Sequence, residues 1–247
     1  MQNKDKISYK QQLLTDFNNR SNYDNGRFYI PIANRLVEFG NLQNGQKILD
    51  IATGTGIVAL KAAQKVGSEG KVIAVDISSG MLSNAKQKLA QTSLQNVEFI
   101  EADAEKLDFD DNSFNAILCS LAVCYLTDIP TALRKWHRFI KTGGFIAFNV
   151  WKENAFPTSV LFREVARRFG VNVPNPNAAM GTIERCTKLL QSIGFRNIQV
   201  ETEQFGWNFG VDEKIAEDIW QMNAKNVFGY QVFQLPPDKL EDCIAEY

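Results

Sequence analysis

The stretch Ile48-Leu-Asp-Ile-Ala-Thr-Gly-Thr-Gly-Ile57 decides the fold that the sequence predicts. It begins with an apolar run typical of a buried strand, carries Asp50 within that run, and passes through two glycines into a helical segment. Gly54 and Gly56 can adopt backbone angles closed to other residues, and they leave no side chain between the main chain and a ligand. We therefore expect a strand, a ligand-binding turn and a helix, in that order.

Further apolar runs follow the first one, and segments with helical periodicity separate them. The expected strands lie at residues 47–51, 71–75, 97–100, 114–118 and 145–150. The expected helices lie at residues 56–66, 79–91 and 130–141, and we expect a glycine of Lys141-Thr-Gly-Gly144 to cap the last one. Strands that alternate with helices predict an α/β fold with a doubly wound, mostly parallel sheet covered on both faces.

The two ends of the chain differ from this central pattern. Residues 1–45 are expected to form an N-terminal helical cap with a helix from about Pro31, and residues 46–204 to form the core. Helices near 158–169 and 180–193 and a strand at 197–203 extend the core. Residues 205–247 are rich in large aromatic side chains, and we interpret them as a helical lid of the same domain.

Composition limits the classes of function. Lys and Arg number 27 and Asp and Glu 28, so the net charge of -1 lacks the basic excess typical of nucleic-acid binding. The cysteines have no C-x-x-C spacing and there is one histidine, so we expect no metal site. We find neither the apolar stretch of a signal peptide nor a run of bilayer length. We expect a soluble, cytoplasmic protein whose substrate is not a nucleic acid.

Two cofactor classes fit the glycine turn. Gly54-x-Gly56-x-x-Ala59, with Asp76 about 20 residues further on, matches a nicotinamide-binding fingerprint. The carboxylate of Asp50, directly before the turn, repels a pyrophosphate but suits a ligand that carries an ammonium and a sulfonium cation. Asp50 thus favours S-adenosylmethionine, and an NAD(P)-dependent oxidoreductase is the alternative.

Asp50-Ile-Ala-Thr-Gly-Thr-Gly56 is similar to the acid-x-G-x-G-x-G first motif of class I methyltransferases, which have a Rossmann-like fold. Ala52 stands where the first glycine usually lies, which is tolerable if that position needs no positive φ. The resemblance covers about residues 30–200 and is closest to UbiE/MenG-like small-molecule methyltransferases. It implies methyl transfer from S-adenosylmethionine, which leaves S-adenosylhomocysteine. The family's usual seventh strand is expected to be hidden in residues 205–234 or missing from this chain.

The resemblance also implies roles for single residues. Asp76 would accept hydrogen bonds from the ribose hydroxyls, with Met81 beside the adenine. Asp103 would accept from the adenine amino group, while the backbone of Ser120 and Leu121 would meet the methionine end. The complete set of expected cofactor-binding residues is Tyr23, Asp50, Ala52, Thr53, Gly54, Thr55, Gly56, Asp76, Ile77, Met81, Asp103, Ala104, Glu105, Ser120 and Leu121.

The acceptor side is less defined. Tyr125 and Trp151 follow the fourth and fifth strands, and with Tyr29 from the cap they are the expected substrate contacts. His137 lies in a helix on the flank of the sheet, so we expect it to be structural and assign no catalytic residue. We expect in-line transfer to an oxygen, nitrogen or carbon atom of an aromatic or apolar acceptor. A cofactor-binding protein without turnover is a further alternative.

Overall fold

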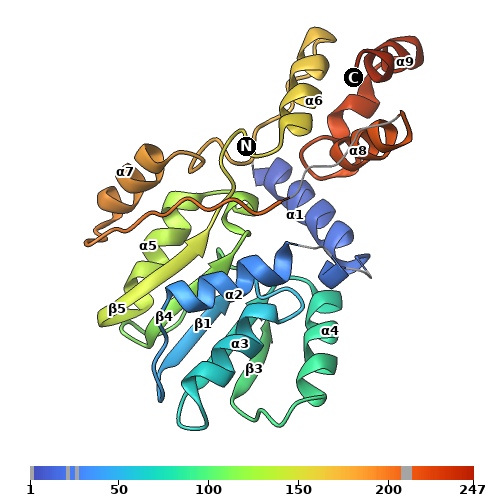
Figure 1. Ribbon diagram of the computed structural model, residues 1–247. Coiled ribbons are helices and arrows are strands. Elements are labelled where there is room, and N and C mark those ends of the chain that lie inside the picture. The colour runs from blue at the N-terminus through green and yellow to red at the C-terminus, as the bar shows by residue number, and fades with distance from the viewer. Residues whose placement is uncertain (1–2, 21–22, 26–27, 207–212) are drawn as a thin grey trace. The chain divides into compact units, whose positions relative to one another are not determined.

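The computed structural model describes residues 3–20, 23–25, 28–206 and 213–247 (Figure 1). The strands are β1 Lys47–Ile51, β2 Lys71–Asp76, β3 Val97–Glu101, β4 Phe114–Ser120 and β5 Ile140–Asn149. The helices are α1 Asn3–Asn18, α2 Tyr29–Phe39, α3 Ile57–Val66, α4 Ser79–Ala90, α5 Ile129–Phe139, α6 Pro157–Arg168, α7 Ile183–Ile193, α8 Glu213–Lys225 and α9 Pro237–Glu246, with short 3-10 helices η1 Tyr23–Asn25, η2 Val123–Tyr125 and η3 Tyr230–Gln234. Within these described ranges, no helix is both long enough and apolar enough to span a bilayer.

The chain folds into two compact units. The core unit comprises Phe17–Val150 and Thr187–Phe205, and the second unit comprises Met1–Asp16, Trp151–Cys186 and Gly206–Tyr247. The expected division into a cap, a core and a lid follows the order of the chain and stays a prediction.

The core unit contains a five-stranded sheet in the order β3-β2-β1-β4-β5, and every neighbouring pair is parallel. Ile48 and Val72 pair in register and share a hydrophobic cluster with residues of α2 and α3, which lie in front of the sheet in Figure 1, while α5 lies behind it. Leu49 and Ile73 alternate with them and point to the opposite face. Burial on both faces explains the continuous apolar runs of the sequence. The predicted α/β fold is confirmed.

The junction between α5 and β5 differs from the sequence prediction. The helix ends at Phe139, and Ile140 is already extended and pairs with Phe114 of β4. Gly143, with φ of 80°, lies inside β5, where the pairing shifts in register. The predicted glycine cap was wrong because strand pairing begins before the helix could continue to a glycine.

The prediction of a strand at 197–203 is also wrong, because these residues have no regular secondary structure. Their alternating pattern resembles a strand, but no described strand pairs with them. Two acids of the segment instead bind Arg35 of α2, with N–O distances of 3.1 Å to Glu201 and 2.5 Å to Glu203. The described part of the C-terminal segment, residues 213–247, contains helices and no seventh strand, and residues 207–212 lie outside the described residues.

The second unit has its own hydrophobic cluster. Phe162 of α6, Trp220 of α8 and Val232 of η3 are buried together, with Leu240 of α9 packed against them. The Trp220 ring meets Phe162 and Phe233 edge-on, at centroid distances of 6.0 and 5.9 Å. Trp220 therefore contributes a large aromatic side chain of the C-terminal segment to the helical core of this unit, whereas Phe233 is exposed.

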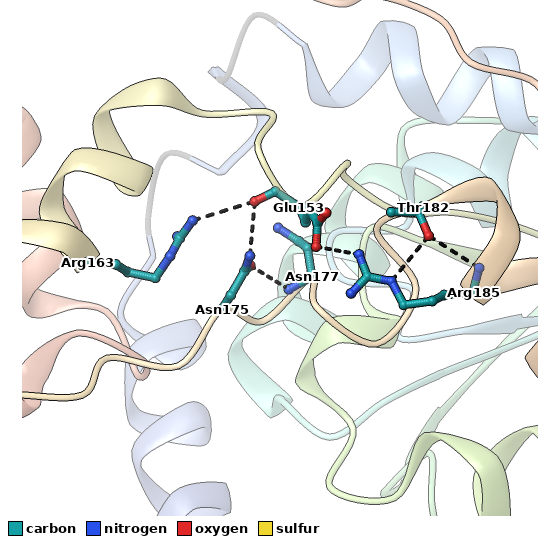
Figure 2. Close-up of polar contacts among 6 residues, drawn as sticks. All are labelled: Glu153, Arg163, Asn175, Asn177, Thr182 and Arg185. Atoms are coloured by element: carbon teal, nitrogen blue, oxygen red, sulfur yellow. Dashed lines mark hydrogen bonds and ion pairs between the residues drawn. The ribbon is translucent and has the colours of Figure 1, made fainter. Parts of the chain in front are cut away.

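A polar network around Glu153 organises the loops of the second unit (Figure 2). The carboxylate of Glu153 forms an ion pair with Arg185, and its carbonyl accepts hydrogen bonds from Asn175 at 3.0 Å and Arg163 at 3.5 Å. Thr182 accepts from Nε of Arg185 at 3.1 Å. We call these residues the Glu153 network; it joins the segment after β5 to the loop before α7.

Candidate cofactor-binding site

Asp50 lies at the carboxyl edge of the sheet, near the end of β1, and is fully buried. Its Oδ2 accepts a hydrogen bond from the Thr53 hydroxyl at 2.5 Å, whereas Oδ1 has no hydrogen-bond partner among the described residues. Burial raises the pKa of Asp50 to about 7; the Thr53 hydrogen bond and a weaker interaction with the Ala59 backbone N–H oppose this shift, and the carboxylate of Asp76 adds to it. A buried carboxylate with one unsatisfied oxygen is suited to a cationic ligand group.

The glycine turn after β1 has an unusual backbone. Ala52, Gly54 and Gly56 all have positive φ, of 54°, 56° and 81°. A Cβ atom on Gly56 would lie 3.1 Å from the Cβ of Ala85 in α4, so any side chain at position 56 would press on that helix. Alanine would be free of strain at position 52 only if that position needed no positive φ. The structure has a left-handed conformation there, so this condition is not met. Ala52 is therefore a strained point of the site.

Asp76, at the end of β2, connects the two loops that follow β1 and β2. Its Oδ2 accepts from the backbone N–H of Gly54 at 2.7 Å, and its Oδ1 accepts from that of Ser78 at 2.8 Å. Burial raises the pKa of Asp76, and these backbone hydrogen bonds counteract the shift. Ile77 lies between Asp76 and Ser78 in the sequence, and Met81 is buried in the first turn of α4. Each Asp76 oxygen keeps a further lone pair for a ligand hydroxyl.

The segment after β3 is fixed by its own contacts. Oδ1 of Asp103 accepts from the backbone N–H of Glu105 at 3.0 Å, and the carbonyl of Ala104 accepts from the Trp136 indole at 3.1 Å. The Glu105 carboxylate accepts from the backbone and hydroxyl of Thr127, at 3.1 and 2.8 Å. Glu105 thus holds the segment before α5, a contact that the sequence did not predict.

Ser120 and Leu121 follow β4 and depend on a residue that sequence reasoning missed. Oδ1 of Asn149, at the end of β5, accepts from the Leu121 backbone N–H at 2.8 Å and from the Ser120 hydroxyl at 3.3 Å. Leu121 has a φ of 55°, so Asn149 supports a strained turn. The position of Asn149 in the sequence could have indicated this role, because it ends an apolar strand at the same edge of the sheet as Asp50 and Asp76.

The turns after β1 and β4, together with residues of η1, α2 and α3, line a small pocket that opens to solvent. Its lining residues are Tyr23, Tyr29, Ala33, Asp50, Ala52, Thr53, Gly54, Ile57, Val58, Ser120 and Leu121. The structure therefore brings together seven of the expected cofactor residues and one expected substrate residue. The remaining expected cofactor residues, which are not among those lining it, are Thr55, Gly56, Asp76, Ile77, Met81, Asp103, Ala104 and Glu105. Which residues touch the cofactor stays a prediction.

Aromatic side chains form one wall of this region. Tyr23 and Tyr29 stack with ring centroids 4.4 Å apart and planes inclined by 13°. Tyr125 is not among the lining residues, and it meets Phe17 edge-on at 5.3 Å. Burial raises the pKa of all three tyrosines. Trp151 belongs to the second unit, where its ring contacts Phe156 at 4.8 Å, and its role as a substrate contact stays a prediction.

The chemistry of the lining distinguishes the two expected cofactor classes. Asp50 is the only carboxylate among the lining residues, and none of them is a lysine or arginine. A pyrophosphate would face this acid without a basic side chain in the lining, whereas a sulfonium with an ammonium group would complement it. Aromatic faces such as that of Tyr23 also attract cations. The residues present therefore fit S-adenosylmethionine.

Comparison with known proteins decides the family. A model of the ubiE/COQ5 methyltransferase family matches residues 33–171, which is more than half of the chain. The chain belongs to this family. Membership confirms the expected recognition as a class I methyltransferase, the expected enzyme class and S-adenosylmethionine as the cofactor, in preference to a nicotinamide.

Individual relatives agree with this assignment. Aklanonic acid methyltransferase DauC from Streptomyces sp. (strain C5) is 35% identical over 61% of this chain and 70% of its own length. The ubiquinone/menaquinone biosynthesis C-methyltransferase UbiE from Coxiella burnetii is 42% identical, but the match covers only 42% of each chain. A SAM-dependent methyltransferase structure from Aquifex aeolicus, 22% identical, covers 69% of this chain and 84% of its own with a TM-score of 0.55, which supports the fold alone.

Proposed function

We propose that this methyltransferase transfers a methyl group from S-adenosylmethionine to an oxygen, nitrogen or carbon atom of a small acceptor with an aromatic or apolar body. The observation that carries this proposal is the stacked pair of Tyr23 and Tyr29 in the pocket that also contains Asp50. Aromatic walls favour flat, apolar ligands. Relatives named for aklanonic acid and for ubiquinone and menaquinone biosynthesis support an acceptor of this kind.

When bound, S-adenosylmethionine supplies an electrophilic methyl group on a sulfonium centre. The protein's part is to bind, to orient and to exclude water. Asp50 would hold a cationic part of the cofactor, and the turns around Gly54 and Leu121 would present backbone groups to it. Alignment of the acceptor with the methyl group is the main contribution that such a site can make.

The acceptor has to supply much of its own reactivity. Tyr23, Tyr29 and Tyr125 have raised pKa values, so at neutral pH they donate hydrogen bonds and do not act as bases. The one histidine, His137, is exposed on α5 and meets Phe195 edge-on at 4.6 Å. We therefore favour acceptors with an acidic oxygen or carbon, such as phenols, reduced quinones and enolisable ketones.

A methyl-transfer screen tests this proposal. The purified chain would be incubated with S-adenosylmethionine and matched acceptors in three sets: neutral phenols and reduced quinones, aromatic carboxylic acids, and polar charged amines. We expect production of S-adenosylhomocysteine only with ring-bearing acceptors of largely apolar character. Turnover restricted to the charged amines would contradict the acceptor class. Tight cofactor binding without turnover on any acceptor would favour the alternative of a binding protein.

The expected location belongs to the same proposal. A cytoplasmic protein has direct access to S-adenosylmethionine made in the cell, and cell fractionation with an antibody to the chain would test this location.

A further inference from the structure

Asn18, at the end of α1, contacts the loop after β2. Its Oδ1 accepts a hydrogen bond from the Ser78 hydroxyl at 2.7 Å and from the Gly80 backbone N–H at 3.1 Å. A Cβ atom on Gly80 would lie 3.0 Å from the backbone carbonyl oxygen of Asn18, so the backbone at Asn18 approaches the first turn of α4 closely. Asn18, which belongs to the core unit, is therefore fixed against the loop that carries Asp76.

Asp24, in η1, contacts the glycine turn after β1. Its Oδ1 accepts a hydrogen bond from the hydroxyl of Thr55, and its Oδ2 forms an ion pair with Lys88 of α4. Thr55 is only 3% exposed, whereas the Asp24 and Lys88 side chains are each 31% exposed. One carboxylate thus connects η1, the glycine turn and α4.

Tyr23, the residue before Asp24, links the Asp24 contacts to ligand exchange. Tyr23 lines the pocket and stacks on Tyr29, and burial raises its pKa. Because Tyr23 and Asp24 are adjacent in one short helix, a shift of the η1 backbone that carries Tyr23 away from the pocket would also strain the bonds of Asp24. Tyr23 is therefore held in the pocket wall by a contact outside the pocket.

We propose that Asp24 is a positioning residue that holds Tyr23 across the cofactor pocket, so that cofactor release requires Asp24 to separate from Thr55 and Lys88. This inference rests on the cofactor occupying the pocket next to Asp50. It assigns Asp24 and Lys88 a role in cofactor retention, separate from recognition of the acceptor.

The Asp24–Lys88 ion pair and the Thr55–Asp24 hydrogen bond contribute unequally to cofactor retention. A partly exposed ion pair is still screened by salt and contributes modestly, so Lys88 has a small effect. Loss of the Asp24 acceptor leaves the buried Thr55 hydroxyl without its partner, which carries a desolvation penalty as well. Removal of the whole carboxylate should therefore accelerate cofactor release more than removal of the charge alone.

Dissociation of S-adenosylhomocysteine from the full chain, measured by stopped-flow displacement, tests the proposal. We expect Asp24→Ala to raise the dissociation rate about tenfold. Asp24→Asn and Lys88→Met should each raise it about threefold, and their combination no further, because both remove the same ion pair. Lys86→Met, on the same helix and exposed, is the matched control and should leave the rate unchanged.

Salt dependence gives a second readout that does not involve turnover. The wild-type dissociation rate should rise between about 50 and about 500 mM salt, whereas Asp24→Asn and Lys88→Met should be insensitive. If Asp24→Ala does not fold, Asp24→Asn and Lys88→Met still test the proposal. Rates within twofold of wild type in both of these variants would overturn it. Failure of the wild-type chain to bind S-adenosylhomocysteine would overturn the cofactor assignment instead.

Discussion

The carboxyl edge of the core-unit sheet and the Glu153 network both concentrate polar groups, but they satisfy them to different degrees. At the sheet edge, Asp50 is fully buried with no described partner for Oδ1, and Ala52 and Leu121 have positive φ. In the Glu153 network, both the carboxylate and the carbonyl of Glu153 are bonded (Figure 2). Unsatisfied groups and backbone strain indicate a ligand site, whereas satisfied groups indicate a structural role.

Asp50→Asn should produce the largest effect on the sheet-edge side of this comparison. We expect the dissociation constant for S-adenosylmethionine to rise at least about 100-fold, because the cation loses its buried counter-charge. The variant without ligand should be more stable than wild type at pH 8, on the order of a few kcal/mol, because asparagine cannot ionise in the buried site. Calorimetric titration and thermal unfolding at pH 8 measure the two changes.

Asp108→Asn is the control for this variant, because Asp108 is an exposed acid paired with Arg138. It changes the net charge by the same amount and should alter neither the dissociation constant for S-adenosylmethionine nor the stability at pH 8 appreciably. Unchanged affinity in Asp50→Asn would show that the unsatisfied oxygen of Asp50 does not mark the cofactor site.

The pH dependence of the wild-type chain tests the role of Asp50 without a substitution. The pKa of Asp50 is about 7 in the fold and about 3.9 in an unfolded chain, so the folded state binds more protons between these values. The Asp50 contribution therefore makes the ligand-free protein less stable as pH rises from about 4 to 7. Cofactor affinity should show the opposite trend, rising by up to about tenfold per pH unit until about pH 7. Unfolding and calorimetry across this range measure both.

Asp50→Asn should remove the Asp50 part of both trends and leave any part that comes from Asp76, whose pKa burial also raises. If affinity remains pH-dependent in that variant with the same midpoint, another group is responsible. Titration in two buffers with different ionisation enthalpies gives a direct test, because the wild-type chain should release a proton on cofactor binding below pH 7.

The positions of the elements were predictable where local patterns agree with tertiary pairing. All five strands and the helix after the glycine turn follow from apolar periodicity and glycine placement. Residues 197–203 have the same local pattern, yet this segment contacts Arg35 and pairs with no described strand. Strand formation depends on a neighbouring strand that the sequence does not specify.

The candidate site could likewise be predicted only in part from the sequence. The ends of parallel strands share one edge, which is why acids spaced along the sequence could be grouped in advance. Asn149, Asp24 and Asn18 act through contacts between residues far apart in the sequence, with no motif of their own. The positive φ of Ala52 was not predictable either, because alanine rarely adopts it and the turn imposes it.

Ala52→Gly tests the backbone strain of the sheet edge. Glycine has no Cβ penalty at a φ of 54°, so we expect stabilisation by about 1 kcal/mol in urea unfolding. Ala62→Gly, inside α3, is the matched control and should destabilise by about 1 kcal/mol or more. The same substitution thus has opposite signs at the two positions. Destabilisation at position 52 would mean that the left-handed conformation is not strained there.

Glu153→Gln should produce the smallest effect, because it alters one half-exposed ion pair in an otherwise satisfied network. The substitution removes the charge that faces Arg185 but leaves the carbonyl that accepts from Asn175. We expect a loss of about 0.5 kcal/mol in urea unfolding and an unchanged dissociation constant for S-adenosylhomocysteine. A large loss of cofactor affinity would contradict the structural role of this network, because fully bonded groups would then act on the cofactor as strongly as the unsatisfied groups of the sheet edge do.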